Sequence, residues 1–341
     1  MKKYPIIVFF TFLFLVPLFA GGKQDAPSEA SGSAPGAARS GKVVVYMPSP
    51  AGLADKLAAG FEARTGVKVE QFQGTTGEIL ARLETEAANP LADVVILASW
   101  ADGLAMKKQG KLLAYAPAGS DLMHRAWRDG DNTIFGVSAS AVGVIYNTTI
   151  FPVLSADWNE LSGTNYKDQL AIPDPEKSGS CKDFLAGFIN NKGDAAGWKV
   201  WENLASNGMK VPGANAAALE AVTTGEKGIL VAGVDYNAYS SITRGEPLNI
   251  YYPAGGTVIN PRPAMILKTS PNPDNARAFM DYLLSDEAQK LVANAYLLPG
   301  RGDIVCTNRA NVSDIPVLET DWEWMMNHAS EIAARLNQLC K

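Results

Sequence analysis

Histidine and cysteine are scarce in this chain of 341 residues, which contains two histidines and three cysteines. A histidine-built zinc site or a Ser-His-Asp triad has little to be built from, because His124 and His328 are the only imidazoles. Basic residues are not in excess either, since 30 lysines and arginines stand against 35 acidic residues, a net charge of −5. Nucleic-acid-binding domains carry a strongly positive face, so this balance argues against a nucleic-acid partner.

The motifs of the common enzyme classes are also missing. The sequence has no G-x-S-x-G elbow, H-E-x-x-H helix, G-x-x-x-x-G-K-[ST] loop or G-x-G-x-x-G turn. Cys181 has no histidine near it in sequence to activate it as a nucleophile. An adhesin is suggested only by Arg301-Gly302-Asp303, and a tripeptide is too short a signal. We therefore expect no catalysis and no cofactor.

One long apolar run is present, at the N-terminus, from Ile6 to Ala20. It follows Lys2 and Lys3 and precedes two glycines, which is the order of a secretory signal peptide. The alternative is an uncleaved anchor, but the run contains Pro17 and is shorter than the roughly 20 apolar residues of a spanning helix. We predict that residues 1–20 form a signal peptide cleaved near Ala20, and that residues 21–41, rich in Gly, Ala, Ser and Pro, form a flexible linker.

Export would place the three cysteines in a compartment where disulfides form. They are Cys181, Cys306 and Cys340, so at least one stays unpaired. Cys306 and Cys340 flank the last predicted helix, and we expect a bridge between them and a free thiol at Cys181.

From residue 42 onward, predicted strands alternate with predicted helices. The strands are at 42–47, 67–72, 93–98, 142–146, 169–172, 229–234, 248–252 and 264–267, and the helices at 51–65, 76–88, 100–109, 180–189, 194–207, 214–223, 275–284, 287–296 and 322–339. This alternation predicts an α/β fold of mostly parallel sheets flanked by helices. About 300 mature residues exceed a single simple core, so two lobes are expected.

Small hydroxyl residues and glycine recur around the ends of these strands. They are Ser49, Thr75, Thr76, Ser99, Ser138, Ser140, Ser178, Gly179 and Ser180. Any one of them is more often a plain helix cap. Free N–H groups and the helix dipole at helix N-termini favour an anion, however, and sites in α/β folds lie at the carboxyl ends of strands. The recurrence predicts an anion site built from N–H and hydroxyl donors at strand-to-helix junctions, without a cationic side chain beside them.

Several segments, in this order, resemble a known family. They are FEARTGVKVEQFQGTTGEILARLETEAANPLADVVILAS, then PDPEKSGS, VDYNAY and SDEAQKLVANAYLLPGRGD. They resemble bacterial periplasmic solute-binding proteins of the type II fold, the group that includes ferric-ion, thiamine, phosphonate and hexose-phosphate binders. The resemblance runs from about Lys42 to Ile304.

The resemblance implies a two-lobed, hinged (venus flytrap) protein of the periplasm. Such a protein, as a monomer, delivers a small solute to the membrane permease of an ABC importer. The first lobe would hold residues 42–138 and 256–341, including the C-terminal helix, and the second lobe residues 139–255. Gly255-Gly256 would lie in the hinge, where glycine absorbs backbone rotation.

The ligand class is left open by the resemblance. Ferric binders of this family usually carry two adjacent tyrosines after a late strand, and phenolates suit a hard cation. Here that position reads VDYNAY, so the pair is broken, and the adjacent Tyr251-Tyr252 belongs to another strand. Trp100 and Tyr236 are placed to line the site, and Asp235 either accepts from sugar hydroxyls or caps a helix. We expect a small anionic solute such as a sugar phosphate and no metal, with ferric ion, thiamine or a phosphonate as alternatives.

Overall fold

The computed structural model describes residues 40–341. The predicted signal peptide, and the predicted linker up to residue 39, lie outside the described residues. The helices are α1 (Ala51–Thr65), α2 (Thr76–Thr85), α3 (Trp100–Lys108), α4 (Gly179–Lys192), α5 (Asp194–Ser206), α6 (Asn215–Thr223), α7 (Asp235–Thr243), α8 (Pro273–Leu283), α9 (Asp286–Asn294) and α10 (Trp322–Leu339).

The strands form one mixed sheet. Its order is β2 (Lys68–Gln73), β1 (Lys42–Met47), β3 (Val94–Ile96), β9 (Ile259–Leu267), β5 (Phe135–Asn147), β7 (Ile229–Val234) and β6 (Leu170–Ala171), with β4 (Leu112–Leu113) on β9, and β8 (Leu248–Tyr251) and β10 (Leu298–Pro299) on β5. Strand pairs β1–β2, β1–β3 and β6–β7 are parallel, whereas every pair that includes β5 or β9 is antiparallel. The predicted α/β class is confirmed, but the sheet is mixed rather than mostly parallel.

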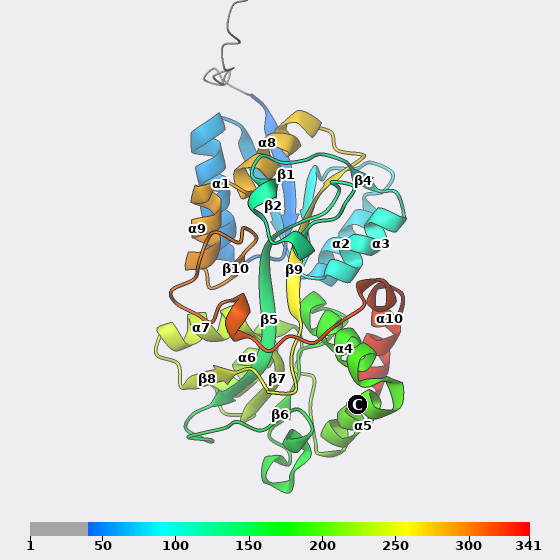
Figure 1. Cartoon of the computed structure of the whole chain (residues 1–341), viewed down its shortest axis with the longest axis vertical. Coiled ribbons are helices and arrows are strands. Elements are labelled where there is room, and N and C mark those ends of the chain that lie inside the picture. Colours follow the sequence, from blue (N-terminus) through cyan, green and yellow to red (C-terminus); the bar gives the residue numbers. More distant parts are fainter. Residues whose placement is uncertain (1–39) are drawn as a thin grey trace, which may run out of the picture. The chain divides into compact units, whose positions relative to one another are not determined.

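Two lobes meet along β5 and β9. We use "first lobe" for β1–β4 and β10 with α1–α3, α8 and α9, and "second lobe" for β6–β8 with α4–α7 (Figure 1). The N-terminal half of β5 pairs with β9 and β10, and its C-terminal half pairs with β7 and β8, so this single strand connects the two lobes. The residue boundaries of the lobes in the sequence analysis stay a prediction.

The first lobe has an apolar core on each face of its strands, and the continuous apolar run of β1 shows why. In β1, Val43 and Val45 pack with α1 and α8, while Val44 and Tyr46 belong to a second apolar cluster with residues of α2 and α3. Successive side chains of a strand point to opposite faces, so both faces of β1 are covered. Figure 1 shows α1, α8 and α9 on one side of these strands and α2 and α3 on the other.

The sequence prediction placed most helices and strands within a few residues of their observed bounds. The main differences are β5 and β9, which were predicted at 142–146 and 264–267 but begin at Phe135 and Ile259. The N-terminal parts of the two strands, which were not predicted, contain Ser138-Ala139-Ser140 in β5 and Pro261 in β9. These residues are uncommon in strands, and the two segments become strands by pairing with each other. Helix α7 and the short strands β4 and β10 were not predicted.

The C-terminal helix α10 packs against α4 and α5 of the second lobe and against α3 of the first. Within residues 40–341, no helix combines the length and the apolar character that crossing a membrane requires.

The predicted bridge between Cys306 and Cys340 is wrong, because all three cysteines are free thiols. Cys306 lies beside the loop at Asn311, whose side-chain oxygen accepts from its N–H. Cys340, at the end of α10, is instead close enough to Cys181 to raise the pKa of that buried thiol further, after burial itself.

Candidate functional site

Strands β5 and β9 carry four polar side chains where the lobes meet. Ser138 pairs with Arg262 across the antiparallel ladder, and Ser140 pairs with Asn260. Because side chains alternate along a strand, all four lie on one face of this strand pair. They are at most 5% exposed. We call these four residues the polar face.

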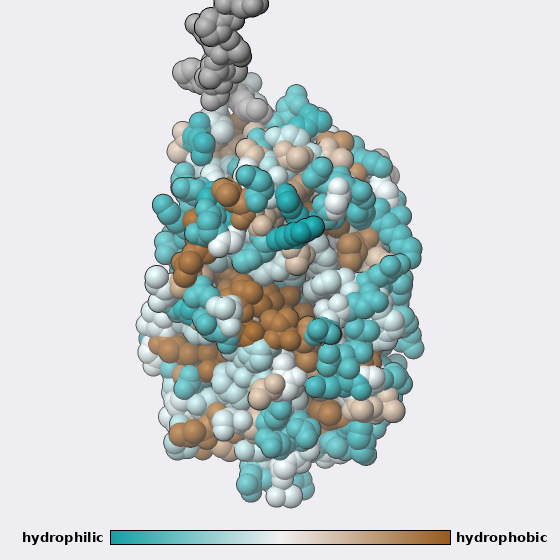
Figure 2. All heavy atoms as spheres, viewed as in Figure 1, coloured by the Kyte–Doolittle hydropathy of each residue, from teal (hydrophilic) through white to brown (hydrophobic). Residues whose placement is uncertain are grey.

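The opposite face of the same two strands is apolar. Ala139, Ala141 and Ile259 belong to an apolar cluster that also includes Leu298 and Ile315. Figure 2 shows brown, hydrophobic atoms gathered in the middle of the viewed face, where β5 and the chain after β10 lie in Figure 1. One face of the strand pair therefore packs as core, and the other presents buried polar groups.

The first lobe brings strand ends against the polar face. The carbonyl oxygen of Pro48, just after β1, accepts a hydrogen bond of 2.5 Å from Arg262 Nη2. Ala98, just after β3, donates its N–H to Thr76 Oγ1 at 3.2 Å. Its carbonyl oxygen accepts from Ser180 Oγ of the second lobe at 3.4 Å. The carboxyl ends of β1 and β3 thus lie beside the polar face, as expected for an α/β site.

The second lobe contributes the first turn of α4. Ser178 caps this helix by accepting from the N–H of Cys181 at 3.2 Å. Ser180 Oγ lies 3.4 Å from Ser140 Oγ of the polar face. A Cβ on Gly179 would lie 2.9 Å from Thr76 Oγ1 and 3.0 Å from the Ser99 Cβ, so only glycine allows this close approach.

Asp183, one turn further along α4, joins the two lobes. Its carboxylate accepts from the Ser99 hydroxyl at 2.7 Å and from the Trp100 N–H at 2.8 Å, both at the start of α3. Beside it, Lys182 and Asp102 form an ion pair of 2.7 Å between the same two helices. Burial, followed by the charge of Asp102, raises the pKa of Asp183 to about 7.

Arg262 is a buried cation without a carboxylate partner among residues 40–341. Its guanidinium lies 5.8 Å from the centroid of the Tyr236 ring, and burial lowers its pKa. The carboxylate of Asp235, which acts on Arg262 from nearby, already forms a 2.6 Å ion pair with Arg309, in which both side chains are fully buried. The expectation that no cationic side chain accompanies the site hydroxyls is therefore wrong.

Asp235 accepts four hydrogen bonds inside the protein. One of its oxygens accepts from Arg309 Nη2, from the Ala141 N–H at 3.0 Å and from the Tyr252 hydroxyl at 3.1 Å. The other accepts from the N–H of Tyr236 at 2.7 Å. These bonds tie α7 to β5, to the segment after β8 and to the chain after β10, so the structure gives Asp235 an anchoring role. Its predicted contact with a ligand stays a prediction.

The structure brings part of the predicted site together. Direct contacts place Thr76, Gly179 and Ser180 beside the polar face, which itself includes the predicted Ser138 and Ser140. Ser138 lies inside β5, however, and not at a strand-to-helix junction as expected.

The other predicted residues lie around this centre. Ser99 and Trp100 bind Asp183, Ser178 caps α4 and donates to Asn215 Oδ1 at 2.8 Å, and Tyr236 is beside Arg262. Thr75 forms a capping box with Glu78, and Ser49 is half-buried next to Pro48.

Sequence reasoning missed Asn260, Arg262 and Asp183. A signal for the first two exists, because polar residues alternate with proline in Asn260-Pro261-Arg262-Pro263 directly before an apolar strand end. Such alternation indicates a strand with one polar face. Asp183 has no comparable signal, since its partners Ser99 and Trp100 belong to a distant part of the chain.

The adjacent tyrosines are bound within the protein. Tyr251 donates its hydroxyl to the Ala156 carbonyl oxygen at 2.8 Å, and Tyr252 contacts Asp235 and, at 3.4 Å, the Tyr239 hydroxyl. Burial raises the pKa of both phenols above the usual range. Among residues 40–341, no three side chains of His, Cys, Asp or Glu are grouped to hold a metal ion.

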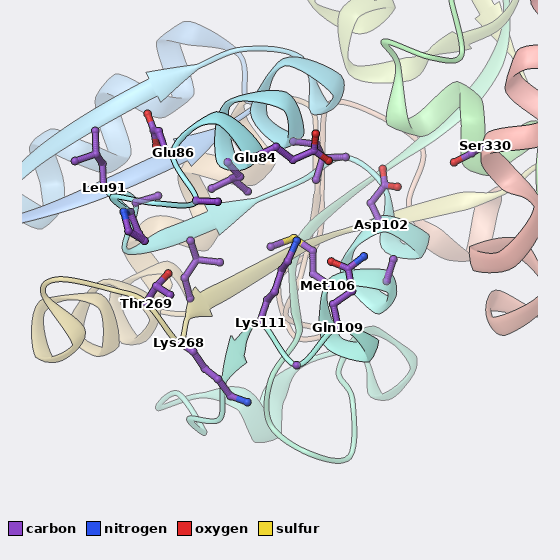
Figure 3. A pocket seen from close by; sticks show the side chains of 18 residues that line it. Glu84, Glu86, Leu91, Asp102, Met106, Gln109, Lys111, Lys268, Thr269 and Ser330 are labelled. Carbon is purple, nitrogen blue, oxygen red and sulfur yellow. The ribbon is translucent and has the colours of Figure 1, made fainter.

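A separate groove of about 820 Å³ lies on the first lobe (Figure 3). It is bordered by residues of α2 and α3 such as Glu84 and Met106, together with Lys111 after α3, Lys268 after β9 and Ser330 of α10. None of the residues predicted to bind ligand lines it.

Comparisons with known proteins agree with the fold and differ in ligand. A family model described as bacterial extracellular solute-binding protein matches residues 89–326. The chain is 26% identical over 264 residues to "Iron uptake protein A1" of Synechocystis sp., covering 72% of each chain. It is also 26% identical over 276 residues to a "Putative 2-aminoethylphosphonate-binding periplasmic protein" of Salmonella typhimurium, covering 78% of this chain and 80% of that one.

Two solved structures illustrate the similarity in fold. The periplasmic binding protein AfuA from Actinobacillus pleuropneumoniae, with fructose-6-phosphate bound, matches with a TM-score of 0.79 and 22% identity over 87% of this chain and 97% of that one. Iron-bound HitA from Pseudomonas aeruginosa matches with a TM-score of 0.76 and 20% identity over 86% of this chain and 99% of that one. The predicted two-lobed periplasmic binding fold is confirmed.

Proposed function

This chain belongs to the bacterial extracellular solute-binding proteins, and we propose that it captures a small anionic solute on the polar face between its lobes. As a member of this family it is a solute-binding component of an ABC importer rather than an enzyme. The solute we propose is a phosphorylated organic molecule such as a sugar phosphate. A permease would receive it from the monomeric, exported protein.

The observation that carries this proposal is the burial of Arg262 without a counter-charge. Removing a cation from water costs several kcal/mol in order of magnitude unless an opposite charge or hydrogen bonds compensate it. One carbonyl oxygen, that of Pro48, accepts from this guanidinium, and the nearby Asp235 is paired with Arg309. A bound anion would supply the missing negative charge, since guanidinium groups match the geometry of phosphate and carboxylate oxygens.

Neutral donors surround this cation. The serine hydroxyls of the polar face and Ser180 at the start of α4 meet where the lobes touch. A helix N-terminus carries about half a positive charge, so α4 adds to the attraction for an anion. The proposed ligand would therefore be held by one guanidinium, several hydroxyls and a helix dipole.

Closure of the lobes would complete the site. Helix α4 contributes Ser180 to the site and Asp183 to the contact with α3, so the same helix that faces the ligand also joins the lobes. Gly256 has a φ of +89°, a conformation natural to glycine, and lies in the chain that leads into β9. We propose that rotation in β5 and near Gly256 opens and closes the lobes around the solute.

Fewer features of the structure support a ferric ion as the ligand. Iron sites of the tyrosine type need ionised phenols, whereas Tyr251 and Tyr252 have raised pKa values and hydrogen bonds inside the protein. The unpaired charge at the polar face is positive, which repels a free metal cation.

Calorimetry with the purified protein tests the proposal. We expect fructose 6-phosphate or a related phosphate ester to bind, and Arg262→Met to weaken that binding at least 100-fold. Arg244→Met is the matched control, because the guanidinium of this arginine donates hydrogen bonds to the hydroxyls of Ser240 and Ser241 at the end of α7. Tight binding of ferric citrate with a tyrosinate absorption band, and no response to any phosphate ester, would overturn the proposal.

A further inference from the structure

Two buried polar atoms on the polar face have no hydrogen-bond partner among residues 40–341. They are Asn260 Oδ1, an acceptor, and Arg262 Nε, a donor. Buried polar atoms are nearly always paired, so an unpaired one needs an explanation. Here one unpaired acceptor and one unpaired donor lie two residues apart on the same face of β9.

The orientation of the Asn260 amide follows from its surroundings. Its nitrogen Nδ2 donates to the Val258 carbonyl oxygen at 3.4 Å. If the amide were turned over, two oxygens would face each other at that contact, which is unfavourable. The unpaired atom of Asn260 is therefore an acceptor, and the group that completes it must be a donor.

We propose that the solute carries a hydrogen-bond donor, either a hydroxyl or an ammonium group, that Asn260 Oδ1 accepts while the anionic group of the solute faces Arg262. This inference rests on the proposed function, because it assumes the same site. It adds that the solute is bifunctional and that Asn260 determines specificity.

The spacing of the two residues limits the size of the solute. Two residues along a strand span roughly 6.5 Å. An anionic group and a donor separated by a short carbon chain or a sugar ring fit this spacing, whereas a monatomic ion does not reach from one residue to the other. Ser138 and Ser140, opposite these residues on β5, are placed to bind either end, since a hydroxyl both donates and accepts.

Matched pairs of small anions test the inference by calorimetry on the purified full-length mature protein. For the ammonium form of the donor the pair is 2-aminoethylphosphonate and ethylphosphonate. For the hydroxyl form it is fructose 6-phosphate and ethyl phosphate. In each pair the second probe keeps the anionic group but lacks the donor. We expect the donor-bearing probe of one pair to bind about tenfold or more tightly than its partner, the cost of leaving a buried acceptor unpaired.

The variant Asn260→Leu removes the acceptor at nearly constant volume. We expect the tenfold preference to fall to about onefold, while thermal stability changes little, because the unpaired amide oxygen is removed and only the long 3.4 Å hydrogen bond to the Val258 carbonyl oxygen is lost. Asn260→Ser, whose hydroxyl is too short to reach the same position, gives the same test if the leucine is not tolerated.

Asn147→Leu is the control. Asn147 is also buried on β5, but its Nδ2 donates to the Val222 carbonyl oxygen and its Oδ1 accepts from Thr149. This substitution should lower stability and leave the preference unchanged.

The outcomes separate the two claims. If both members of each pair bind equally, or if the preference survives in Asn260→Leu, the inference about Asn260 is overturned and the anion site at Arg262 stands. If no probe binds, neither claim survives. A preference that is lost only in the Asn260 variants supports the inference, and the pair that shows it identifies the donor as ammonium or hydroxyl.

Discussion

The two faces of the β5–β9 pair have the same backbone but opposite character. On one face, Ala139, Ala141 and Ile259 lie in an apolar cluster. On the other face, the serines, Asn260 and Arg262 are equally buried, yet two of their polar atoms have no hydrogen-bond partner in the part of the chain that the structure describes. Burial alone therefore does not distinguish core from site. The distinction lies in whether the buried groups satisfy one another.

Two buried arginines extend this comparison. Arg309 is fully paired, with Asp235 and with the carbonyl oxygens of Tyr296 and Ala310. Arg262 has the Pro48 carbonyl oxygen as an acceptor and no ion pair among the described residues. The first arginine is built into the fold, whereas the second has no counter-charge among the described residues, which is why we propose it as the anion site.

The largest expected effect separates these two arginines. Arg309→Met leaves the carboxylate of Asp235 buried without a cation, and we expect it to lower the free energy of unfolding by about 3–5 kcal/mol. Arg262→Met should change that free energy much less, because it leaves no buried charge unpaired and the Pro48 carbonyl oxygen loses only one hydrogen bond. Urea unfolding of the two variants provides the comparison. Equal losses of stability would mean that both arginines are structural.

The next effect is on the pH dependence of stability, through Asp183. Its pKa is raised to about 7 in the folded protein, first by burial and then by Asp102, with Lys182 opposing. The folded state therefore holds this proton up to about pH 7, whereas the unfolded chain releases it near pH 4. The resulting stabilisation is complete below about pH 4 and is lost as the pH rises to about 7, by about 4 kcal/mol at most.

Asp183→Asn removes the titrating carboxyl group. The amide oxygen of the asparagine keeps one hydrogen-bond acceptor for the start of α3. We expect the free energy of unfolding of the variant to change less between pH 5 and pH 8 than that of the natural protein. Urea unfolding at both pH values measures the difference. If the natural protein instead gains stability from pH 5 to pH 8, and Asp183→Asn loses this gain, the carboxylate of Asp183 is held ionised in the folded state.

The faces themselves can be compared by removing side chains from each. Leu298→Ala removes most of an apolar side chain from the cluster. It should lower the free energy of unfolding by about 3 kcal/mol and leave the ligand affinity of the folded protein unchanged. Ser140→Ala should cost about 1 kcal/mol or less of stability and should instead weaken ligand binding. Thermal unfolding and calorimetry on both variants check this. The assignment of the faces fails if Ser140→Ala is as destabilising as Leu298→Ala.

The smallest effect concerns the glycine that lets α4 approach the polar face. Gly179→Ala would bring a methyl group within 3.0 Å of Ala98 and Ser99, and we expect affinity to fall about tenfold, roughly 1.4 kcal/mol. Gly52→Ala, in α1, is the matched control, because, apart from its chain neighbours and its own helix backbone, nothing among residues 40–341 lies within 4 Å of its added Cβ. It should stabilise the protein by up to about 1 kcal/mol and leave affinity unchanged. Unchanged affinity in Gly179→Ala would show that closure tolerates the methyl group.

Much of the fold follows from local sequence. The continuous β-branched and apolar run from Val43 to Met47 is enough to predict a strand, and Ser99 and Ser178 precede helices that they do cap. These signals depend on neighbours along the chain, which is why every helix except α7 is found with nearly correct bounds.

The site was only partly predictable, because its key residues depend on partners far away in sequence. Arg262 becomes part of the site by pairing with Ser138 of another strand, and the prolines around it hide the strand from local rules. Asp235 was a possible ligand contact in sequence, but its partner Arg309 is near the other end of the chain. The hydroxyl positions were predicted, and the charge at their centre was not.

Native mass spectrometry of the protein as purified tests the central claim most directly, because it shows which small molecule the protein retains and whether Arg262 is needed to retain it. We predict that the natural protein retains a small organic anion, and that Arg262→Met, although folded, does not retain it. A retained ferric ion, a retained cation, or the same anion bound equally by Arg262→Met would contradict the account.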